Sequence, residues 1–220
     1  MSYKYELHCH SSEVSRCSHI DGKTLAEEYI KAGYDGVVLT NHMSRFTYMD
    51  LPDMPWNQMV DFYLDGYHLV KEAAGNRLTV LLGMEICFHE NFSDFLVYGL
   101  DEAFLYEHGN LMELGIQRFS KLAHEHGLLV FQAHPFRNRM TIADPSLLDG
   151  VEVHNGNPRH DSRNDVARLW AKKFHLLMSS GSDYHEYGDI DRGGMLTERP
   201  IRTNADLVQA LQGEHTLIER

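Results

Sequence analysis

The 220-residue sequence has few cysteines, no long apolar run and fewer basic than acidic residues. Its 3 cysteines, Cys9, Cys17 and Cys87, form no CxxC pair and leave an odd one over, so a reducing compartment is expected. Apolar runs such as Gly127–Ala133 are too short to cross a bilayer, and residues 1–10 lack a basic region followed by an apolar stretch. These absences predict a cytoplasmic protein that does not bind a membrane.

Basic residues are scarce enough to bear on the choice of partner. The chain carries 20 Lys and Arg against 32 Asp and Glu, so its formal charge is −12, and it has no run of Lys or Arg. Such a chain repels a polyanion, which disfavours a long nucleic acid as a partner and favours something small. Its 43% of apolar and 24% of charged residues are ordinary for a globular protein, so disorder is excluded. The oligomeric state stays open.

Histidine, by contrast, is abundant, with 15 residues. Short apolar runs alternate with helical patterns and no linker interrupts them, which is typical of one α/β domain over residues 1–220 with parallel strands. Strands are predicted at Tyr3–His8, Gly36–Thr40, Leu78–Glu85, Phe95–Gly99, Leu128–Ala133, Gly150–His154, Leu176–Ser180 and Thr216–Glu219. Helices are predicted at Leu25–Ala32, Trp56–Ala74, Leu111–His126, Arg163–Lys173 and Asn204–Leu211.

The first of these helices has signals at both ends. Thr24 and Glu27 have the spacing of a capping box, in which each side chain bonds the backbone N–H at the other position. Gly33 follows the last residue and suits the left-handed conformation that often ends a helix. The pattern predicts a helix that begins after Thr24.

Histidines and acids gather where the predicted strands end. In a parallel barrel all these ends lie on one face, which is where such barrels carry their active sites. Imidazole and carboxylate groups together bind Zn²⁺, Mn²⁺ or Fe²⁺, and the scarcity of thiols disfavours a closed structural site. We therefore expect an open, catalytic metal cluster. The polar residues at strand ends are His8, His10, Asn41, His42, Glu85, His134, His154, Asp183 and His185.

The His-x-His pair at positions 8 and 10 has a geometry of its own. Alternate residues on an extended segment point the same way, so both imidazoles can reach one ion, whereas Cys9 points away from it. The pair alone is a weak signal. With Glu85 and Asp183 it becomes a site with four ligands.

These residues resemble the PHP (polymerase and histidinol phosphatase) family of metal-dependent phosphoesterases. The resemblance runs over nearly the whole chain. It implies a distorted TIM-like (β/α)7 barrel with two or three divalent metal ions, Zn, Mn or Fe, at the C-terminal ends of the strands. The motifs occur in the order of the family as His8-Cys9-His10, Thr40-Asn41-His42, Gly83-Met84-Glu85, His134-Pro135 and Gly181-Ser182-Asp183-Tyr184-His185.

The resemblance also implies how the ligands are shared among the ions. The first ion is held by His8, His10, Glu85 and Asp183. Glu85 bridges to a second ion, which His134 also binds. The third ion is held by His42 and His185 together with a histidine from the loop after the first strand, where His19 is the one histidine present.

The sequence departs from the family pattern in two places. Many relatives place a histidine ligand of the second ion between the Glu and the His-Pro motifs, but the segment 93–99 has none. Either His89 substitutes from the preceding loop, or the second site is weak or unfilled. Asn41 stands where Asp is more usual, which we expect to alter the orientation of His42. His154 suits a structural hydrogen bond as well as a role in the site.

The expected activity is hydrolysis of a small phosphomonoester, or of a short nucleotide phosphoester, by attack of a metal-activated water. Glu85 and Asp183 would act as metal ligands. Arg137 is the first candidate for binding the phosphate, and Arg159 and His160 come next. Two alternatives remain open: an amidohydrolase-type hydrolase acting on C–N or C–O bonds, and a PHP-type scaffold domain without catalysis.

Overall fold

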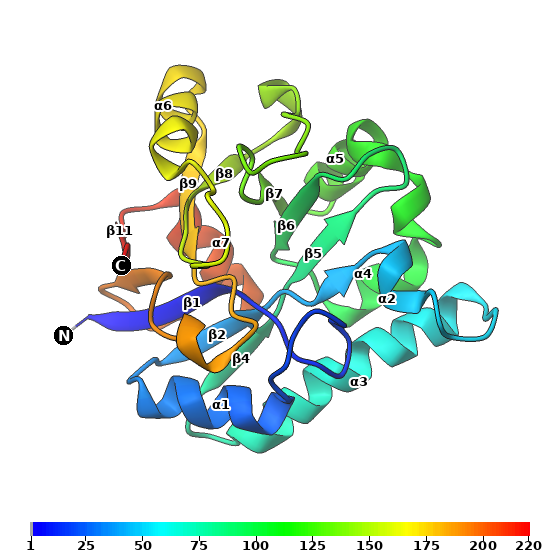
Figure 1. The fold of residues 1–220 in the computed structure, drawn as a ribbon, viewed down its shortest axis with the longest axis horizontal. Helices are drawn as coiled ribbons and strands as arrows, with labels where there is room; N and C mark the ends of the chain where they lie inside the picture. Colours follow the sequence, from blue (N-terminus) through cyan, green and yellow to red (C-terminus); the bar gives the residue numbers. More distant parts are fainter. Residues whose placement is uncertain (1) are drawn as a thin grey trace.

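Two hydrogen-bonded sheets form the centre of the molecule in the computed structural model, which describes residues 2–220 (Figure 1). The first sheet has the order β11-β10-β1-β2-β4 and the second has the order β3-β5-β6-β7-β8-β9. The strands are β1 (Tyr3–Cys9), β2 (Gly36–Leu39), β3 (His42–Met43), β4 (Thr79–Leu82), β5 (Met84–Cys87), β6 (Asp94–Tyr98), β7 (Leu129–Gln132), β8 (Gly150–Asn155), β9 (Leu177–Gly181), β10 (Met195–Thr197) and β11 (Thr216–Leu217).

Helices cover the strands from several sides. In Figure 1, α1 and α3 run together along one side, α4 and α5 lie on a second, and α6 packs beside β8 and β9. Among residues 2–220 there is no helix with both the length and the apolar character needed to span a bilayer. The helices are α1 (Gly22–Lys31), α2 (Arg45–Tyr48), α3 (Trp56–Ala74), α4 (Glu102–Glu107), α5 (Gly115–Glu125), α6 (Asn164–Phe174) and α7 (Asn204–Gln212), with 3-10 turns at Leu111–Glu113, Pro145–Leu147 and Tyr187–Asp189.

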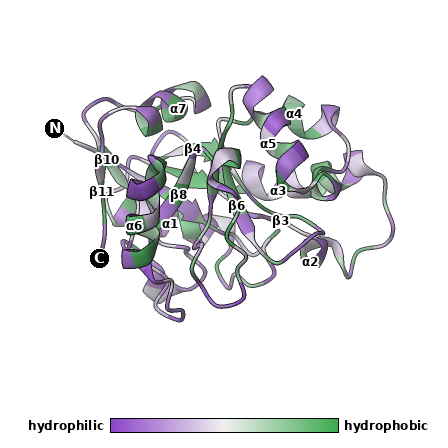
Figure 2. Ribbon diagram, turned by 90° about the horizontal axis from the view of Figure 1, so that it is seen from above, coloured by the Kyte–Doolittle hydropathy of each residue, from purple (hydrophilic) through white to green (hydrophobic). Residues whose placement is uncertain are grey.

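Burial follows the hydropathy of each element. Every residue of β2 and of β7 is buried, as expected for continuous apolar strands that are covered on both faces. The surface helices instead alternate between hydrophilic and hydrophobic residues along their length, as α6 and α7 show in Figure 2. In α7 the buried positions are Leu207 and Leu211, four residues apart on one face. The apolar face of each helix therefore covers a sheet of buried strands.

Two strands pass from the first sheet into the second. The segment of β2 continues as β3 after Thr40 and Asn41, and β4 continues as β5 after Gly83. The pairing persists across both breaks, because Gly83 N donates to Leu39 O at 3.0 Å and Glu85 N donates to Asn41 O at 3.1 Å. The two breaks therefore carry His42 and Glu85 onto neighbouring strands, where they pair in register.

The α/β fold is confirmed, but a closed barrel of parallel strands is not found within residues 2–220. Strand β6 runs antiparallel to both β5 and β7, because the loop of residues 88–93 is too short for the crossover that a parallel pair requires. The unpredicted β10 also pairs antiparallel with β1. Strands β1 and β9 pack side by side, and Cys9 forms a bridge with Tyr184 there instead of a continuous ladder.

A glycine allows the close approach of β1 and β9. A Cβ atom placed on Gly181 would lie 2.3 Å from the Cβ of His8, which is far closer than real side-chain atoms approach. Any larger residue would push the end of β9 away from β1. Gly181 thus sets the distance between His8 and Asp183, which follows two residues later.

Local signals were accurate for most elements and wrong at the first helix. The side chain of Asp21 accepts a hydrogen bond from Thr24 N at 2.7 Å, so α1 begins at Gly22 and Asp21 is the capping residue in place of Thr24. An aspartate accepts this bond as well as threonine does, and it stands earlier in the chain. Gly33 has φ +73°, as the sequence indicated.

A buried carboxylate fastens β1 to the loop after β9. Glu6 is fully buried, and its Oε1 accepts hydrogen bonds from the backbone N–H groups of Leu7, His8 and Ser182 at 2.9–3.0 Å. Its Oε2 accepts from the Ser182 hydroxyl and, at 3.0 Å, from the Tyr29 hydroxyl. All five donors point at one group that only accepts hydrogen bonds. The carboxylate therefore satisfies donors of β1, of α1 and of the loop after β9 at the same time.

We expect Glu6→Gln to lower the free energy of unfolding by roughly 2–4 kcal/mol, because one side-chain oxygen becomes an NH₂ donor that faces other donors. Denaturant unfolding of the variant beside wild type measures the change. Glu27→Gln is the matched control, since Glu27 is exposed on α1 and has no side-chain partner among the described residues. A loss below about 0.5 kcal/mol for Glu6→Gln would contradict this account of the β1–β9 junction.

Candidate metal centre

Seven of the predicted ligands meet at one end of the strands. They come from the end of β1 and the residue after it, from the starts of β3 and β5, and from the segments that follow β7 and β9. Six of the seven are buried, and His42 alone is partly exposed. The residues that the structure brings together are His8, His10, His42, Glu85, His134, Asp183 and His185.

Glu85 lies at the middle of this cluster. Its Oε2 is 3.3 Å from His8 Nε2 and 3.2 Å from His10 Nε2. The same oxygen is 2.9 Å from His42 Nδ1, while Oε1 is 3.1 Å from His134 Nε2. One carboxylate therefore faces four imidazoles, which is the position of a group that bridges two ions.

Asp183 closes the cluster from the opposite side. Its Oδ1 is 3.4 Å from His8 Nε2 and 3.6 Å from His10 Nε2. The same oxygen is 3.3 Å from His185 Nδ1, and Oδ2 accepts a hydrogen bond from Arg137 Nη2 at 2.8 Å. The two carboxylates thus face the same pair of imidazole nitrogens from two directions.

Three of the converging atoms are buried without a hydrogen-bond partner among the described residues. They are His8 Nε2, His10 Nε2 and Glu85 Oε2. Buried polar atoms are nearly always paired, because an unpaired one loses its hydration without compensation. Ligand atoms of these three residues lie within 4.8 Å of one another. The arrangement fits a divalent cation with nitrogen and oxygen ligands.

Hydrogen bonds behind the cluster fix the orientation of its imidazoles. His8 Nδ1 is 2.8 Å from the Oε1 of buried Glu152, and His10 Nδ1 is 3.1 Å from the Ser15 hydroxyl. In each ring the outer nitrogen is engaged, so Nε2 is the atom that faces the centre. Metal-ligating histidines typically have such outer partners.

Asn41 acts on the cluster by a route that the sequence did not indicate. Its Oδ1 accepts hydrogen bonds from Ser11 N at 2.8 Å and from the Ser15 hydroxyl at 3.0 Å. The Ser15 oxygen also accepts from His42 N at 2.9 Å. Asn41 therefore orients His10 and the backbone of His42 through Ser15, rather than the His42 ring directly.

The backbone is strained at two ligands. His134 has φ +29° and Asp183 has φ +51°, in the left-handed region that residues with a Cβ rarely adopt. Each such residue costs on the order of 1–3 kcal/mol and persists where the surrounding contacts impose it. The strain turns both side chains toward the cluster directly after their strands end.

Electrostatics act differently on the members of the cluster. Burial lowers the pKa of His8 and of His42, but the Glu152 carboxylate beside His8 and the Glu85 carboxylate beside His42 outweigh it, so both pKa values lie well above the usual one. Burial raises the pKa of Glu85, but the imidazoles of His42 and His8 lower it by more than burial raises it. The pKa of Glu85 therefore lies well below its usual value. Burial lowers the pKa of His10 to about 4, and the nearby His185 and His42 imidazoles also lower it. At neutral pH, Glu85 is therefore ionised and His10 is neutral, which are the forms that bind a metal ion.

A carboxylate stands where the histidine of the family pattern is missing. Asp94 groups with His42 and Glu85, and its Oδ2 lies 4.0 Å from His134 Nε2. Burial raises the pKa of Asp94 to about 6, and the Glu85 carboxylate raises it as well. His89, by contrast, is exposed and lies outside the cluster, because its loop turns away after β5. The structure thus brings Asp94, not His89, to the second site.

Where the family pattern predicts a histidine for a third ion, the structure places a thiol. His185 Nε2 is 3.1 Å from Cys17 Sγ, and Cys17 and His42 line the same cavity. Burial raises the pKa of Cys17, but His185 and His42 outweigh it and lower the pKa to about 6. His19 is exposed, and only its backbone N–H contacts this region, at His185 O. Both side chains are exposed, but the thiol of Cys17 lies against His185, whereas no side-chain contact joins His19 to the cluster among the described residues.

His154 also lies outside the cluster. Its Nε2 is 3.0 Å from Arg192 O, and its Nδ1 is 3.3 Å from Asn164 Nδ2. Both ring nitrogens are thus engaged by a loop and by the first residue of α6. His154 is a structural residue in this fold, because a register irregularity in β8 between Glu152 and His154 turns its side chain away.

A cavity of about 210 Å³ opens over the cluster, and the three predicted phosphate-binding residues line it. Arg159 is held there by two hydrogen bonds to Asp189, at 2.7 and 2.6 Å. Arg137 is held by Asp183 and Asn155. The full lining is Cys17, His42, Asp94, His134, Arg137, Asn157, Arg159, His160, Asp183 and His185.

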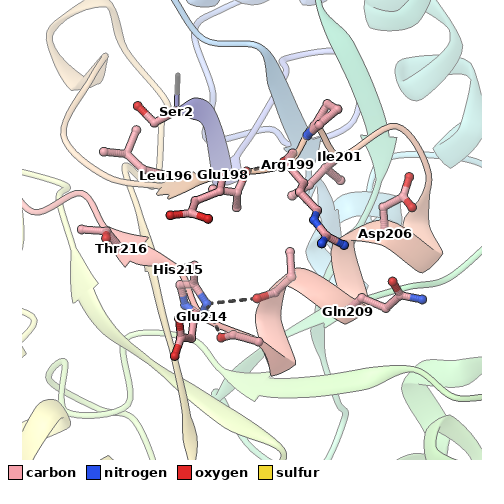
Figure 3. Close-up of a pocket in the computed structure, with 14 residues that line it drawn as sticks. Ser2, Leu196, Glu198, Arg199, Ile201, Asp206, Gln209, Glu214, His215 and Thr216 are labelled. Carbon is pink, nitrogen blue, oxygen red and sulfur yellow. Dashed lines mark hydrogen bonds between the residues drawn. The ribbon is translucent and has the colours of Figure 1, made fainter.

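A cavity of about 960 Å³, larger than the one over the cluster, lies elsewhere (Figure 3). It is formed by β10, α7 and β11, and none of the predicted ligands lines it. The histidine that lines it, His215, already has a hydrogen-bond partner, because its Nδ1 is 3.0 Å from Ala210 O. Cavity volume alone would therefore point away from the group of predicted metal ligands.

Comparison with known proteins gives one family match. The family described as PHP domain matches residues 6–212, which is nearly the whole chain. No curated protein is similar enough to this sequence to be matched with it.

Solved structures share the fold at low sequence identity. A two-domain protein from Bacteroides vulgatus that contains a predicted PHP-like metal-dependent phosphoesterase has a TM-score of 0.73 and 19% identity, over 100% of this chain and 65% of that one. PsfC from Pseudomonas syringae has a TM-score of 0.70 and 14% identity, over 100% and 92%. An amidohydrolase from Chromobacterium violaceum, solved with bound sulfate, has a TM-score of 0.55 and 15% identity, over 94% and 96%.

We expect Cys17→Ser to remove the most weakly held metal ion and His19→Ala to leave the metal content unchanged, since only the thiol faces His185 and His42. Elemental analysis of both variants after dialysis against equal free metal measures this. The opposite result, loss in His19→Ala and retention in Cys17→Ser, would restore His19 as the ligand.

We expect Asp94→Ala to weaken binding of the second ion by about tenfold or more, because it removes a partly buried oxygen ligand that groups with Glu85 and lies 4.0 Å from His134. Metal titration followed by calorimetry resolves the sites. Asp53→Ala serves as the control, since Asp53 is exposed in the loop before α3. Equal affinity in wild type and Asp94→Ala would show that Asp94 is not a ligand.

Proposed function

The chain belongs to the PHP domain family, and we propose that it is a metal-dependent phosphoesterase that hydrolyses a small phosphomonoester at the cluster around Glu85. The observation that carries this proposal is the convergence of buried, unpaired ligand atoms beneath a cavity lined by two arginines. The ligand atoms suit divalent cations, and the arginines suit the charge of a phosphate group.

Three ions are proposed, of Zn, Mn or Fe, because the nitrogen and oxygen donors suit any of these metals. Glu85 is shared between the first and second ions. The proposed ligands of the first ion are His8, His10, Glu85 and Asp183. Those of the second are Glu85, His134 and Asp94, which also groups with His42. Those of the third are His42, His185 and Cys17, and His10 groups with the same two histidines.

Bound divalent ions would supply a nucleophile at neutral pH by lowering the pKa of water, and would neutralise the phosphoryl charge. In the proposed reaction, water and a phosphomonoester give an alcohol and inorganic phosphate. The oxygen of water bonds to phosphorus, the ester P–O bond breaks, and the leaving oxygen takes up the proton. Glu85 and Asp183 act as ligands in this scheme and not as free bases.

The residues around the cavity orient the phosphate. Arg159 reaches it from a side chain that Asp189 holds in place with two hydrogen bonds. Arg137 has a double role, because its Nη2 already binds Asp183 and so positions a metal ligand as well as presenting positive charge. Burial lowers the pKa of His160, and Arg137 lowers it further, so a neutral imidazole faces the cavity.

Two other functions, an amidohydrolase and a scaffold domain without catalysis, are distinguished by the test below. The similarity to an amidohydrolase shows the fold alone, and within residues 2–220 no lysine lines the cavity over the cluster. A scaffold domain would keep the ligand geometry without turnover.

We further propose that residues 1–220 form one domain, whose two sheets are an opened, distorted form of the (β/α)7 barrel. We also propose a cytoplasmic location, based on the cysteine pattern.

We expect the protein to release phosphate from p-nitrophenyl phosphate in the presence of Mn²⁺, Zn²⁺ or Fe²⁺, and Glu85→Gln to reduce kcat by about 100-fold or more, because the bridging carboxylate is lost. Released phosphate and bound metal are measured on the same samples. Glu27→Gln, at an exposed position, is the control for purification and folding.

Hydrolysis of amides or lactones without hydrolysis of any phosphate ester would instead identify an amidohydrolase. Stoichiometric metal binding without turnover of either class would identify a scaffold. Activity of Glu85→Gln equal to that of wild type would remove the cluster from the reaction.

A further inference from the structure

A second cavity, of about 600 Å³, adjoins the metal centre. Cys17, His42 and Asp94 line both this cavity and the smaller one over the cluster, so the two adjoin at these residues. A phosphate held at the ions can therefore extend its ester group into the larger space. The remaining lining residues are Arg16, Ser44, Phe46, Thr47, Met49, Cys87, Phe92, Asn138, Arg139 and Met140.

The walls of this cavity are unusually apolar for a surface feature. Phe46, Met49 and Phe92 are 46%, 61% and 58% exposed, and all three line it. They come from α2, from the residue that ends it and from the loop before β6. Clustered apolar surface beside an active site costs hydration free energy and marks a surface that an apolar group covers.

The neutral polar groups of the wall are already paired within the protein. Thr47 Oγ1 donates to His42 O at 2.8 Å and lies 3.2 Å from the Ser44 hydroxyl. Asn138 Oδ1 accepts a hydrogen bond from Arg163 at 2.7 Å. A sugar or polyol in this cavity would find few free partners for its hydroxyls, and its burial would be unfavourable.

Arginines lie at and beside the cavity in a way that suits aromatic rings: Arg16 and Arg139 line it, and Arg45 lies next to it on the side of Phe46 and Phe92. The Arg45 guanidinium lies 4.9 Å from the centre of the Phe46 ring and 5.9 Å from that of Phe92. Arg139 is exposed at the rim with φ +74°, and it forms no ion pair with an acid among the described residues. Planar cations beside aromatic side chains stack on flat ligands as well as on one another.

We propose that this cavity receives the leaving group of the substrate and selects phosphomonoesters of large apolar alcohols, above all those that carry an aromatic ring. The inference rests on the proposed phosphoesterase function. A cavity of this size holds a ligand well beyond a short alkyl or glycerol group. Phe46 and Phe92 are specificity residues in this scheme, and they take no part in the bond-breaking step.

The test compares two phosphate esters whose alcohols are equally acidic, 3-phenylpropyl phosphate and propyl phosphate, so that the chemical step is matched. Burial of the phenyl ring should raise kcat/KM for the first by roughly 10- to 100-fold over the second. Calorimetry with 3-phenylpropylphosphonate and propylphosphonate, which are not hydrolysed, should show a preference of the same size in binding.

Phe92→Ala and Phe46→Ala should each reduce this preference about fivefold or more while binding of propylphosphonate changes less than about twofold. Leu169→Ala is the matched control, because Leu169 is 66% exposed on α6 and does not line the cavity. Both phenylalanines are partly exposed, so truncation removes little of the buried core and the variants should fold.

Equal binding of the two phosphonates, or a preference that both phenylalanine variants retain, would overturn the assignment of this cavity. Hydrolysis of both esters without a preference would overturn it and leave the phosphoesterase function standing. A binding preference that depends on Phe46 and Phe92, without hydrolysis of any ester, would support the cavity and count against the phosphoesterase function.

Discussion

One buried carboxylate organises the functional end of this molecule. Glu85 faces four imidazoles at 2.9–3.3 Å, and it is fully buried with an oxygen that has no hydrogen-bond partner among the described residues. A buried carboxylate needs positive charge beside it, which protonated imidazoles or a divalent cation can supply. The fold around Glu85 therefore brings together a compact group of imidazoles and carboxylates that is able to hold metal ions.

Two further buried carboxylates keep these ligands at the required distances. Glu6 ties β1 to the loop after β9, and Glu152 contacts His8 Nδ1 and His134 N from β8. Each of them acts through hydrogen bonds to the segments that carry ligands. Gly181 removes the side chain that would otherwise separate these segments. The centre thus depends on an outer layer of charge and on one close backbone approach.

The prediction from sequence was most accurate where strands run parallel. Parallel strands place their C-terminal ends at one edge, so a histidine or acid just past each apolar run could be assigned to the cluster before the fold was known. The rule missed Asp94, because β6 is antiparallel and its first residue, not its last, lies at that edge. A closer reading of the six-residue loop before β6 would have indicated a hairpin and pointed to its start.

The sequence by itself determined the family, the α/β class and the seven residues of the cluster, because these depend on residue type and on position along single strands. Only the tertiary structure decided which loop side chains join them. Cys17 and His19 are two residues apart, and nothing in their local pattern shows which one lies against the cluster; contact with His185, from a distant segment, decides it. The apolar cavity beside the centre is likewise formed by separate loops, whose meeting no local spacing records.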